Sequence, residues 1–248
     1  MPTAVGVTWR LIDDVGCGPA DHMQRDLAML DDVLAGAPPA LRVYTWSVPT
    51  LSLGKFQSID EIDNDACERL GVALARRPTG GAALLHGGDL TYSVAMPLPE
   101  DGHTGVQEIY DWLARALIAG LARLGVDSAV ARHDGPGGPV CFAGQQGADL
   151  RVGDRKVCGS AQVRRQGAVL QHGSILLRRL AIDECDLVMT PYDKQALRAA
   201  TITLDELGAP CEASVVADAI VTGFMTALGV AFTPTTLVAA KDSRDALM

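Results

Sequence analysis

The sequence predicts an α+β fold, in which a mixed, mostly antiparallel sheet packs against helices outside it. Short apolar runs are interspersed with amphipathic segments, but the two do not alternate strictly as they would in a doubly wound fold. Tight turns at Gly153-Asp154 and Gln166-Gly167 connect three of the runs as antiparallel neighbours. The 248 residues are 48% hydrophobic, which suffices for a large core. We expect one domain over 1–248, with its core at about 20–230 and a flexible tail over 233–248.

Four segments have the residue spacing of helices. The segment 21–35 has one apolar stripe and Asp21 as a plausible N-cap, and the clearest helix, 106–124, has another stripe before Gly125. The two stripes consist of Met23, Leu27, Leu30 and Leu34, and of Ile109, Leu113, Leu117 and Leu121. Charge spacing indicates a helix over 59–70, and Pro210 precedes a last helix at about 212–228.

Seven short segments are expected to be strands, namely 41–46, 48–56, 71–76, 90–98, 148–152, 155–164 and 168–177. Along the first, Leu, Val and Thr alternate with Arg, Tyr and Trp, so the first three are expected to face inward. The stretch 133–147 contains Gly135-Pro136-Gly137-Gly138-Pro139, which excludes regular structure, and a loop is therefore expected there.

Composition and charge exclude several classes of protein. A formal net charge of −9 argues against a general nucleic-acid binder. There is no apolar run near the roughly 18 residues of a membrane span and no signal peptide, so a soluble cytoplasmic protein is expected. The six cysteines show no C-x-x-C pair and no zinc-finger spacing, which predicts neither a disulfide framework nor a metal site. Residues 151–179 are formally +6, which indicates either a docking site for an anionic partner or exposed charges that keep the sheet soluble.

The run 76–86 is the first of three candidate functional clusters. Arg76 and Arg77 precede Pro78-Thr79-Gly80-Gly81 at the end of an expected strand. Paired glycines let the backbone approach a ligand closely, and two guanidinium groups suit a phosphate or a carboxylate. A tight surface turn with a solvated basic edge is the plain alternative.

Cys141 and Lys156 are the candidates for chemistry in the other two clusters. Cys141 follows the Gly/Pro loop, where a thiolate nucleophile can be placed at a cleft. Lys156, Cys158 and Ser160 alternate to one face of their strand. A lysine there would be partly desolvated, which favours the neutral amine and suits catalysis, although a strand-end lysine can also reach water. Cys158 is a competing nucleophile, but a thiol in mid-strand is more often a packing residue.

His86 and His172 are each followed by glycine. Neither has a carboxylate at a sequence spacing that would form a triad or a metal site. We therefore expect both to line the site or to be structural, and neither to be the general base.

The three clusters together resemble the lipoyl/biotinyl protein ligase and acyltransferase superfamily, and within it the octanoyltransferases of the LipM type. The matching pieces occur in family order over about residues 20–180. They are 41–46 with 49–57, 76–86 with 90–93, Cys141-Phe142, and 155–162 with 171–174.

The resemblance implies a biotin/lipoate protein ligase type of catalytic domain and an acyl-transfer enzyme of lipoate biosynthesis. Such an enzyme moves octanoyl from acyl carrier protein to a lysine of a lipoyl-accepting protein, typically the glycine cleavage H protein. The acyl group would be carried as a thioester on Cys141, and Lys156 corresponds to the family's lysine. No ATP or other cofactor is implied, because one thioester is exchanged for another. The residues implied to bind substrate are Arg76, Gly80, Gly81, Ala82, His86, Gly159, Ser160, Ala161, Gln162, His172 and Gly173.

Related activities stay open at this point. ATP-dependent lipoate-protein ligases have a third glycine where this chain has Ala82 and an asparagine where it has Tyr92. Many ligases also carry a further C-terminal domain, whereas 75 residues follow Gly173 here. Octanoyl amidotransferases, which take octanoyl from the H protein, also use a cysteine, and a non-catalytic carrier-binding protein is a third possibility. The chain departs from the transferase pattern at two positions, where Ala82 replaces a common arginine and Asp89 a common glutamate.

Overall fold

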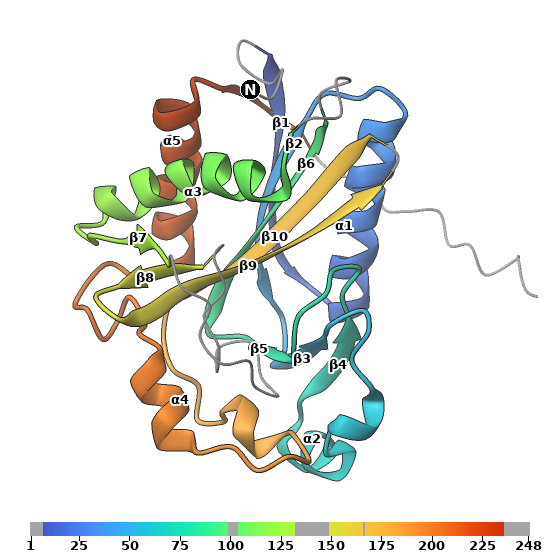
Figure 1. Cartoon of the computed structure of the whole chain (residues 1–248), viewed down its shortest axis with the longest axis vertical. Helices are drawn as coiled ribbons and strands as arrows, with labels where there is room; N and C mark the ends of the chain where they lie inside the picture. The colour runs from blue at the N-terminus through green and yellow to red at the C-terminus, as the bar shows by residue number, and fades with distance from the viewer. Residues whose placement is uncertain (1–6, 99–103, 132–148, 166, 236–248) are drawn as a thin grey trace, which may run out of the picture.

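A computed structural model of the chain describes residues 7–98, 104–131, 149–165 and 167–235 (Figure 1). Within these residues eight strands form one sheet in the order β11-β1-β2-β6-β10-β9-β8-β7. The strands are β1 (Thr8–Cys17), β2 (Ala40–Trp46), β6 (Asp89–Pro97), β7 (Ala129–Val130), β8 (Leu150–Val152), β9 (Arg155–Arg165), β10 (Ala168–Leu176) and β11 (Ala231–Pro234). Strand β1 pairs in parallel with β2 and β11, and the other pairs of this sheet are antiparallel. The predicted α+β class is therefore confirmed.

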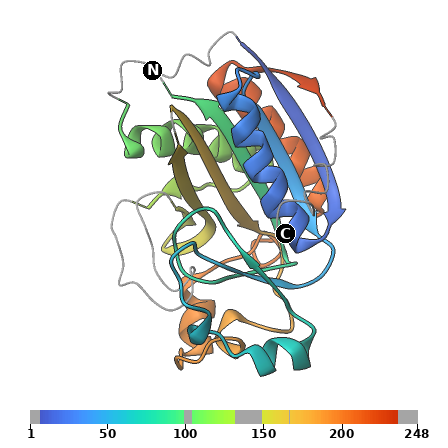
Figure 2. The same ribbon diagram turned by 90° about the vertical axis from the view of Figure 1, so that its right-hand side faces the viewer.

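Helices cover both faces of the large sheet. Helices α3 (Val106–Arg123) and α5 (Ala213–Leu228) lie on one face, and α1 (Pro19–Leu34) lies on the other (Figures 1 and 2). The predicted stripe of α3 is buried in the main core against the sheet and α5. A methyl group at Gly223 would lie 2.3 Å from the carbonyl oxygen of Ala116, so this glycine allows α3 and α5 to pack closely.

Helix α1 differs from the expectation in its cap and in its buried face. Gly18 is the N-cap and Pro19 follows it, so the prediction of Asp21 as the cap was wrong. Leu27 is exposed, because the buried face is rotated toward polar side chains. The buried residues of the helix are His22, Met23, Asp26, Met29, Leu30 and Val33.

Strand β2 is buried on both faces, which corrects the expected inward and outward alternation. Leu41 and Val43 pack in the core under α3 and α5. Arg42 and Tyr44 point toward α1 and are also buried, with 0% and 1% of their surface exposed. A buried guanidinium requires charged or polar partners, and the polar residues on the inner face of α1 supply them.

A smaller three-stranded sheet lies below the large one in Figure 1, in the order β4-β3-β5. Its strands are β3 (Thr50–Leu53), β4 (Ala73–Arg76) and β5 (Leu84–His86). Helices α2 (Asn64–Leu70) and α4 (Lys194–Ala200) belong to the same region. The helix expected over 59–70 is divided into the short turn η1 (Ile59–Glu61) and α2. A further turn, η3 (Glu184–Asp186), follows β10. The pattern did not predict β1, β5, β7, β11 or α4, which are mostly short.

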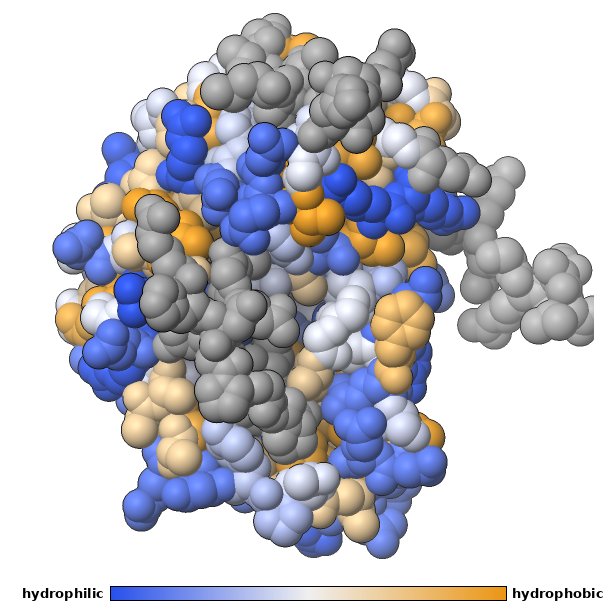
Figure 3. Space-filling view, viewed as in Figure 1, coloured by the Kyte–Doolittle hydropathy of each residue, from blue (hydrophilic) through white to orange (hydrophobic). Residues whose placement is uncertain are grey.

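The cations of the basic segment 151–179 lie in different environments within the described part of the chain. Lys156 is buried, and Arg165 and Arg179 pair with Asp31 and Glu206 on other elements. The long strand β9 separates Arg155 from Arg165. On the face shown in Figure 3, hydrophilic side chains are interspersed with small apolar areas. Among the described residues, no helix combines the length and apolar character that a membrane crossing requires.

Candidate active site

A pocket lies where the large and small sheets meet. It has about 370 Å³ of space, part of it open to solvent, which is at the small end of the range for ligand sites. Its lining comes from α1, β2, β5, β6, β9 and β10, so segments far apart in the sequence build it. The residues that line it are Met23, Tyr44, Trp46, Arg77, Leu84, His86, Thr91, Gly159, Ser160, Ala161, His172 and Gly173.

Lys156 lies directly behind one wall of this pocket. It is buried, with 1% of its surface exposed, and its Nζ is 2.8 Å from a carboxylate oxygen of Asp149. An opposite charge at this distance favours the ammonium form, which opposes the effect of burial. The expected desolvation of Lys156 is therefore present, but the Asp149 carboxylate works against the neutral amine that desolvation alone would favour.

Gly159 makes room for the Lys156 side chain. A Cβ atom at position 159 would lie 3.0 Å from Lys156 Cε and 3.2 Å from Nζ. Gly159 itself lines the pocket, so the lysine ammonium group is held next to the pocket wall. Asp149 could have been found from the sequence, because the Gly153-Asp154 hairpin brings the ends of β8 and β9 together.

We expect Gly159→Ala to lower the activity at this site by about 10- to 100-fold, because the new methyl group would displace the lysine tip from its position. The urea midpoint should also fall, because a displaced ammonium group loses part of its buried contact with Asp149. Steady-state activity and urea unfolding would be measured with Gly105→Ala as the control, where the new methyl meets Glu108 at 3.7 Å, an ordinary contact. Full activity in Gly159→Ala would contradict the placement of Lys156 at this wall.

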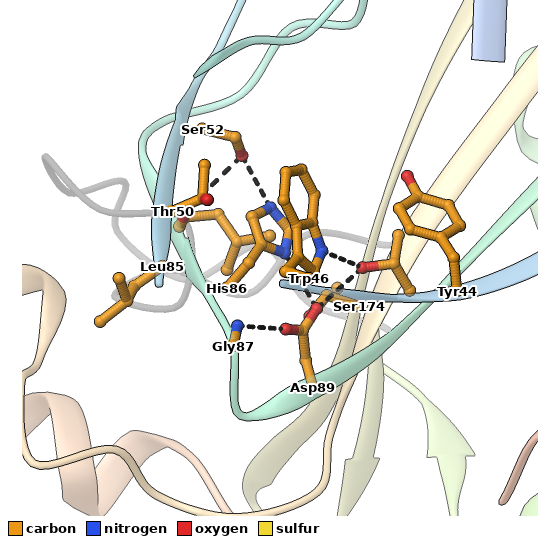
Figure 4. A network of polar contacts seen from close by, with 12 residues as sticks. Tyr44, Trp46, Thr50, Ser52, Leu85, His86, Gly87, Asp89 and Ser174 are labelled. Carbon is orange, nitrogen blue, oxygen red and sulfur yellow. Dashed lines mark hydrogen bonds and ion pairs between the residues drawn. The ribbon is translucent and has the colours of Figure 1, made fainter. Parts of the chain in front are cut away.

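His86 is held in a network of buried polar contacts (Figure 4). Its Nδ1 is 2.9 Å from a carboxylate oxygen of Asp89, and its Nε2 is 2.8 Å from Ser52 Oγ. Its ring also stacks on Trp46, with ring centroids 4.1 Å apart. Burial raises the pKa of Asp89, but His86 and the hydroxyl of Ser174 outweigh it and leave that pKa below its usual value. Asp89 is thus a buried carboxylate that orients the imidazole.

His172 has an equivalent pair of partners. Its Nδ1 is 3.1 Å from a carboxylate oxygen of Asp26, and its Nε2 is 2.7 Å from Thr79 Oγ1. Burial lowers the pKa of His172, although Asp26 opposes this effect. Because the carboxylate accepts a hydrogen bond from Nδ1–H, the other nitrogen accepts one from Thr79.

Both histidines therefore have a carboxylate partner and a hydroxyl partner, which the sequence spacing did not reveal, and both line the pocket. Asp89 is three residues from His86, whereas Asp26 is 146 residues from His172 and only the fold brings them together. Ser52 is fully buried and accepts a hydrogen bond from Arg77, which does not suit a nucleophile. The two histidines line the pocket with both ring nitrogens bonded to protein groups.

His22 lies beside the pocket in the buried cluster under α1. Its Nδ1 is 2.6 Å from a guanidinium nitrogen of Arg42, and its ring stacks on Tyr44. Burial and the positive charge of Arg42 lower the pKa of His22 from 6.5 to about 4. The neutral imidazole accepts the arginine hydrogen bond, and protonation would place two positive charges together.

The protein is expected to lose stability as the pH falls from about 6.5 to about 4, because the unfolded chain binds a proton at His22 that the folded chain resists. His22→Gln should show a smaller loss over this range, because glutamine can accept the arginine hydrogen bond and does not titrate. Urea midpoints at pH 7 and pH 5 would measure the difference. Equal losses in both proteins would contradict the role of His22.

The two arginines of the run 76–86 hold protein backbone. Arg76 donates to the carbonyl oxygens of Gly54, Lys55 and Gln57. Arg77 donates to Ser52 and to the carbonyl oxygens of Gly80 and Ala82. A Cβ atom at Gly54 would lie 1.8 Å from the carbonyl oxygen of Gly81, so the glycine loop packs directly on the segment after β3. Because both guanidinium groups already donate to backbone carbonyl oxygens, the run forms a rigid loop and does not suit a phosphate cradle.

The structure thus brings together part of the expected site. Six of the residues expected to bind substrate line the pocket, namely His86, Gly159, Ser160, Ala161, His172 and Gly173. Arg76, Gly80, Gly81, Ala82 and Gln162 do not line it. Cys141 lies outside the described residues. Cys158 is buried in the main core, as expected of a packing thiol. The apolar lining from Met23, Tyr44, Trp46 and Leu84 was not foreseen.

A second cavity of about 430 Å³ lies between β5 and the region of α4. Its lining includes Glu184, whose burial raises its pKa to about 7. None of the residues expected from the sequence lines this cavity, so the pocket between the two sheets is the candidate active site. Within the described residues, no group of three or more histidine, cysteine, aspartate or glutamate side chains could hold a metal ion.

Known proteins resemble this chain over most of its length. The model of the lipoyl protein ligase A/B catalytic domain family matches residues 18–224. Octanoyltransferase LipM of Symbiobacterium thermophilum is 39% identical over 251 residues, covering 91% of this chain and 88% of that protein. Octanoyltransferase LipM of Carboxydothermus hydrogenoformans is 42% identical, and the match covers 69% of this chain and 65% of that protein.

Solved structures of lipoate protein ligases share the fold. A putative lipoate protein ligase from T. acidophilum with bound lipoic acid superposes with a TM-score of 0.76 at 24% identity, covering 94% of this chain and 90% of that one. A lipoate-protein ligase A bound with ATP gives a TM-score of 0.77 at 23% identity with the same coverage. At this level of identity the likeness establishes the fold alone, and it confirms the expected type of domain.

Proposed function

The chain belongs to the lipoyl protein ligase A/B catalytic domain family and is an acyltransferase, and we propose that it transfers octanoyl from acyl carrier protein to a lysine of a lipoyl-accepting protein. The glycine cleavage H protein is the first acceptor to test, and we expect a cytoplasmic reaction. The observation that carries the proposal is the buried Lys156–Asp149 pair behind the wall of a largely apolar pocket. An octanoyl chain suits the apolar lining, and a fixed ammonium group suits the reacting carbonyl.

The proposed reaction has two acyl-exchange steps. The Cys141 thiolate attacks the thioester carbonyl of the octanoyl carrier, an acyl–enzyme thioester forms, and the carrier leaves as its thiol after protonation. The acceptor lysine then attacks the acyl–enzyme as a neutral amine, the C–S bond breaks as an amide forms, the nitrogen loses one proton to solvent, and the Cys141 thiolate is released. Neither step needs ATP. The acyl–enzyme thioester retains the free energy of the carrier thioester, and that free energy drives formation of the amide.

Lys156 would act on the carbonyl oxygen in both steps. Its ammonium group can donate a hydrogen bond to the oxyanion of each tetrahedral intermediate and would favour the thiolate form of Cys141. Asp149 keeps the lysine charged and oriented. Asp149 directly follows the segment 132–148, which carries Cys141 in the sequence. Cys141 and Lys156, the two proposed catalytic residues, are therefore close together in the sequence, with Asp149 between them.

The proposal can be tested by incubating the protein with octanoyl acyl carrier protein and measuring its intact mass. We expect a gain of one octanoyl group in the wild type and in Cys211→Ala, and no gain in Cys141→Ala. Absence of the adduct from the wild type, or its formation by Cys141→Ala, would overturn the proposal. Transfer that requires ATP and free lipoate would assign a ligase, and transfer only from octanoylated H protein would assign an amidotransferase.

A further inference from the structure

An aromatic side chain projects into solvent from the loop between β3 and η1. Phe56 is 85% exposed, which is the largest exposed fraction of any large apolar side chain in the described part of the chain. A single exposed apolar residue is ordinary on a protein surface, so this exposure alone assigns no role. The loop that carries Phe56 and the side chains around it give the exposure its meaning.

The backbone of this loop is fixed by Arg76. The guanidinium group donates to the carbonyl oxygens of Gly54, Lys55 and Gln57, which lie on both sides of Phe56 in the chain. A side chain that projects from a fixed backbone loses less conformational entropy when a partner covers it. Arg76 therefore presents the Phe56 ring at a set place on the surface.

The loop packs against the run that forms one side of the pocket. A Cβ atom at Gly54 would lie 1.8 Å from the carbonyl oxygen of Gly81, and Arg77 of the same run lines the pocket. Phe56 follows Gly54 by two residues, so its Cα lies within about 8 Å of the Gly54 Cα. A protein that inserts a side chain into the pocket would meet the protein surface in this region.

Two further exposed apolar side chains adjoin the Phe56 loop. Ile59 begins the turn η1 three residues after Phe56, and the Met189 N–H donates to the carbonyl oxygen of Glu61 at the end of that turn. Both Ile59 and Met189 are exposed. Aromatic residues and methionine are enriched in the cores of protein–protein interfaces, so the composition of this region is that of a docking surface.

The charge around these apolar side chains is negative. The segment 55–70 contains five carboxylates and two cations. The exposed carboxylates are Asp60, Glu61, Asp65 and Glu68. An acidic surface attracts a partner with positive charge and repels an acidic one. In the proposed reaction the acceptor brings a lysine, whereas the carrier brings the phosphate of its prosthetic arm, so the charge fits the acceptor.

We propose that Phe56, Ile59 and Met189, with the carboxylates around them, are the docking surface for the acceptor protein. This inference rests on the proposed octanoyl transfer and names the partner that binds for its second step. The acceptor covers Phe56 while its lysine enters the pocket, so the Phe56 side chain contributes to binding and not to chemistry. Acylation of Cys141 by the carrier does not depend on Phe56.

The two steps can be measured separately. Acylation of Cys141 by octanoyl acyl carrier protein in a single turnover reports the first step. Transfer from the preformed acyl–enzyme to increasing concentrations of the glycine cleavage H protein reports the second. Phe56→Ala should raise the H protein concentration at half-maximal rate by about 10-fold, the effect of losing an aromatic anchor. The maximal rate, the first step and the urea midpoint should stay unchanged.

Met225→Ala is the matched control, because it removes an exposed apolar side chain from α5. It should change neither step. Asp60→Lys tests the charge and should raise the half-saturating concentration by about 3-fold at low salt, since a charge at the edge of an interface acts mainly on the rate of association. High salt should reduce this difference, because it screens exposed charges.

Two results would overturn the inference while leaving the proposed function in place. One is a half-saturating H protein concentration that Phe56→Ala does not change. The other is slower acylation of Cys141 in Phe56→Ala, which would assign the surface to the carrier. Failure of the wild type to form the acyl–enzyme would instead overturn the proposed function. Binding of fluorescently labelled H protein to the unacylated protein would then still test the surface, with a 10-fold weaker affinity expected for Phe56→Ala.

Discussion

Asp149→Asn is expected to destabilise the protein by about 3 kcal/mol, because it leaves the ammonium group of Lys156 buried without its charged partner. Lys156→Met should cost a similar amount, because it removes the ammonium partner of the buried Asp149 carboxylate. Both variants should also lose most acyl transfer, because either the lysine or the group that orients it is gone. Urea unfolding and single-turnover acylation would measure the two effects separately.

The double variant Lys156→Met/Asp149→Asn separates stability from chemistry. Replacing both members of a buried ion pair with neutral groups is often close to neutral in stability, so most of the loss should be regained. Acyl transfer should stay lost, since no ammonium group remains. The control is Asp154→Asn in the same hairpin, which removes an exposed pair to Arg151 and should cost less than about 1 kcal/mol. Recovery of activity in the double variant would exclude Lys156 from catalysis.

Asp26→Asn is expected to cost about 3 kcal/mol, because Asp26 is a fully buried carboxylate with four donors. Arg42 approaches one of its oxygens at 2.9 Å, and Tyr44, Ser93 and His172 contact the other. The amide would leave the Arg42 charge with Asp14 as its remaining carboxylate partner. Ser93→Ala removes one neutral donor and serves as the comparison, at about 1 kcal/mol.

The same residue predicts an acid-dependent loss of stability. Burial raises the pKa of Asp26, but His172 and Arg42 outweigh it and leave the pKa below its usual value of 3.8. The contribution of Asp26 is therefore fully present above about pH 3.8 and is lost as the pH falls through the lower pKa of the folded state. Below pH 4 the unfolding free energy of Asp26→Asn should depend less steeply on pH than that of the wild type. Parallel pH profiles would show that Asp26 is not the titrating group.

Much of the fold follows from local pattern. The apolar stripe of α3, the hairpin turns between β8, β9 and β10, and the end of β4 at Arg76 are all where periodicity and turn residues place them. These features depend on neighbours within a few residues of each other. The pattern is less informative for β2 and α1, where Arg42, Asp26 and His22 look exposed in the sequence but are buried against each other. Polar residues satisfy one another in the interior only when distant segments meet.

The sequence by itself determined the fold class, the family resemblance and the candidate residues Cys141 and Lys156. Tertiary structure alone decided which residues surround Lys156, how both histidines are oriented, and that Arg76 holds the loop from which Phe56 projects. The physical reason is that motifs record residue types along the chain, whereas ion pairs and hydrogen bonds depend on distances of about 3 Å across strands and helices. Asp26 and His172, 146 residues apart and 3.1 Å from each other, show that difference most clearly.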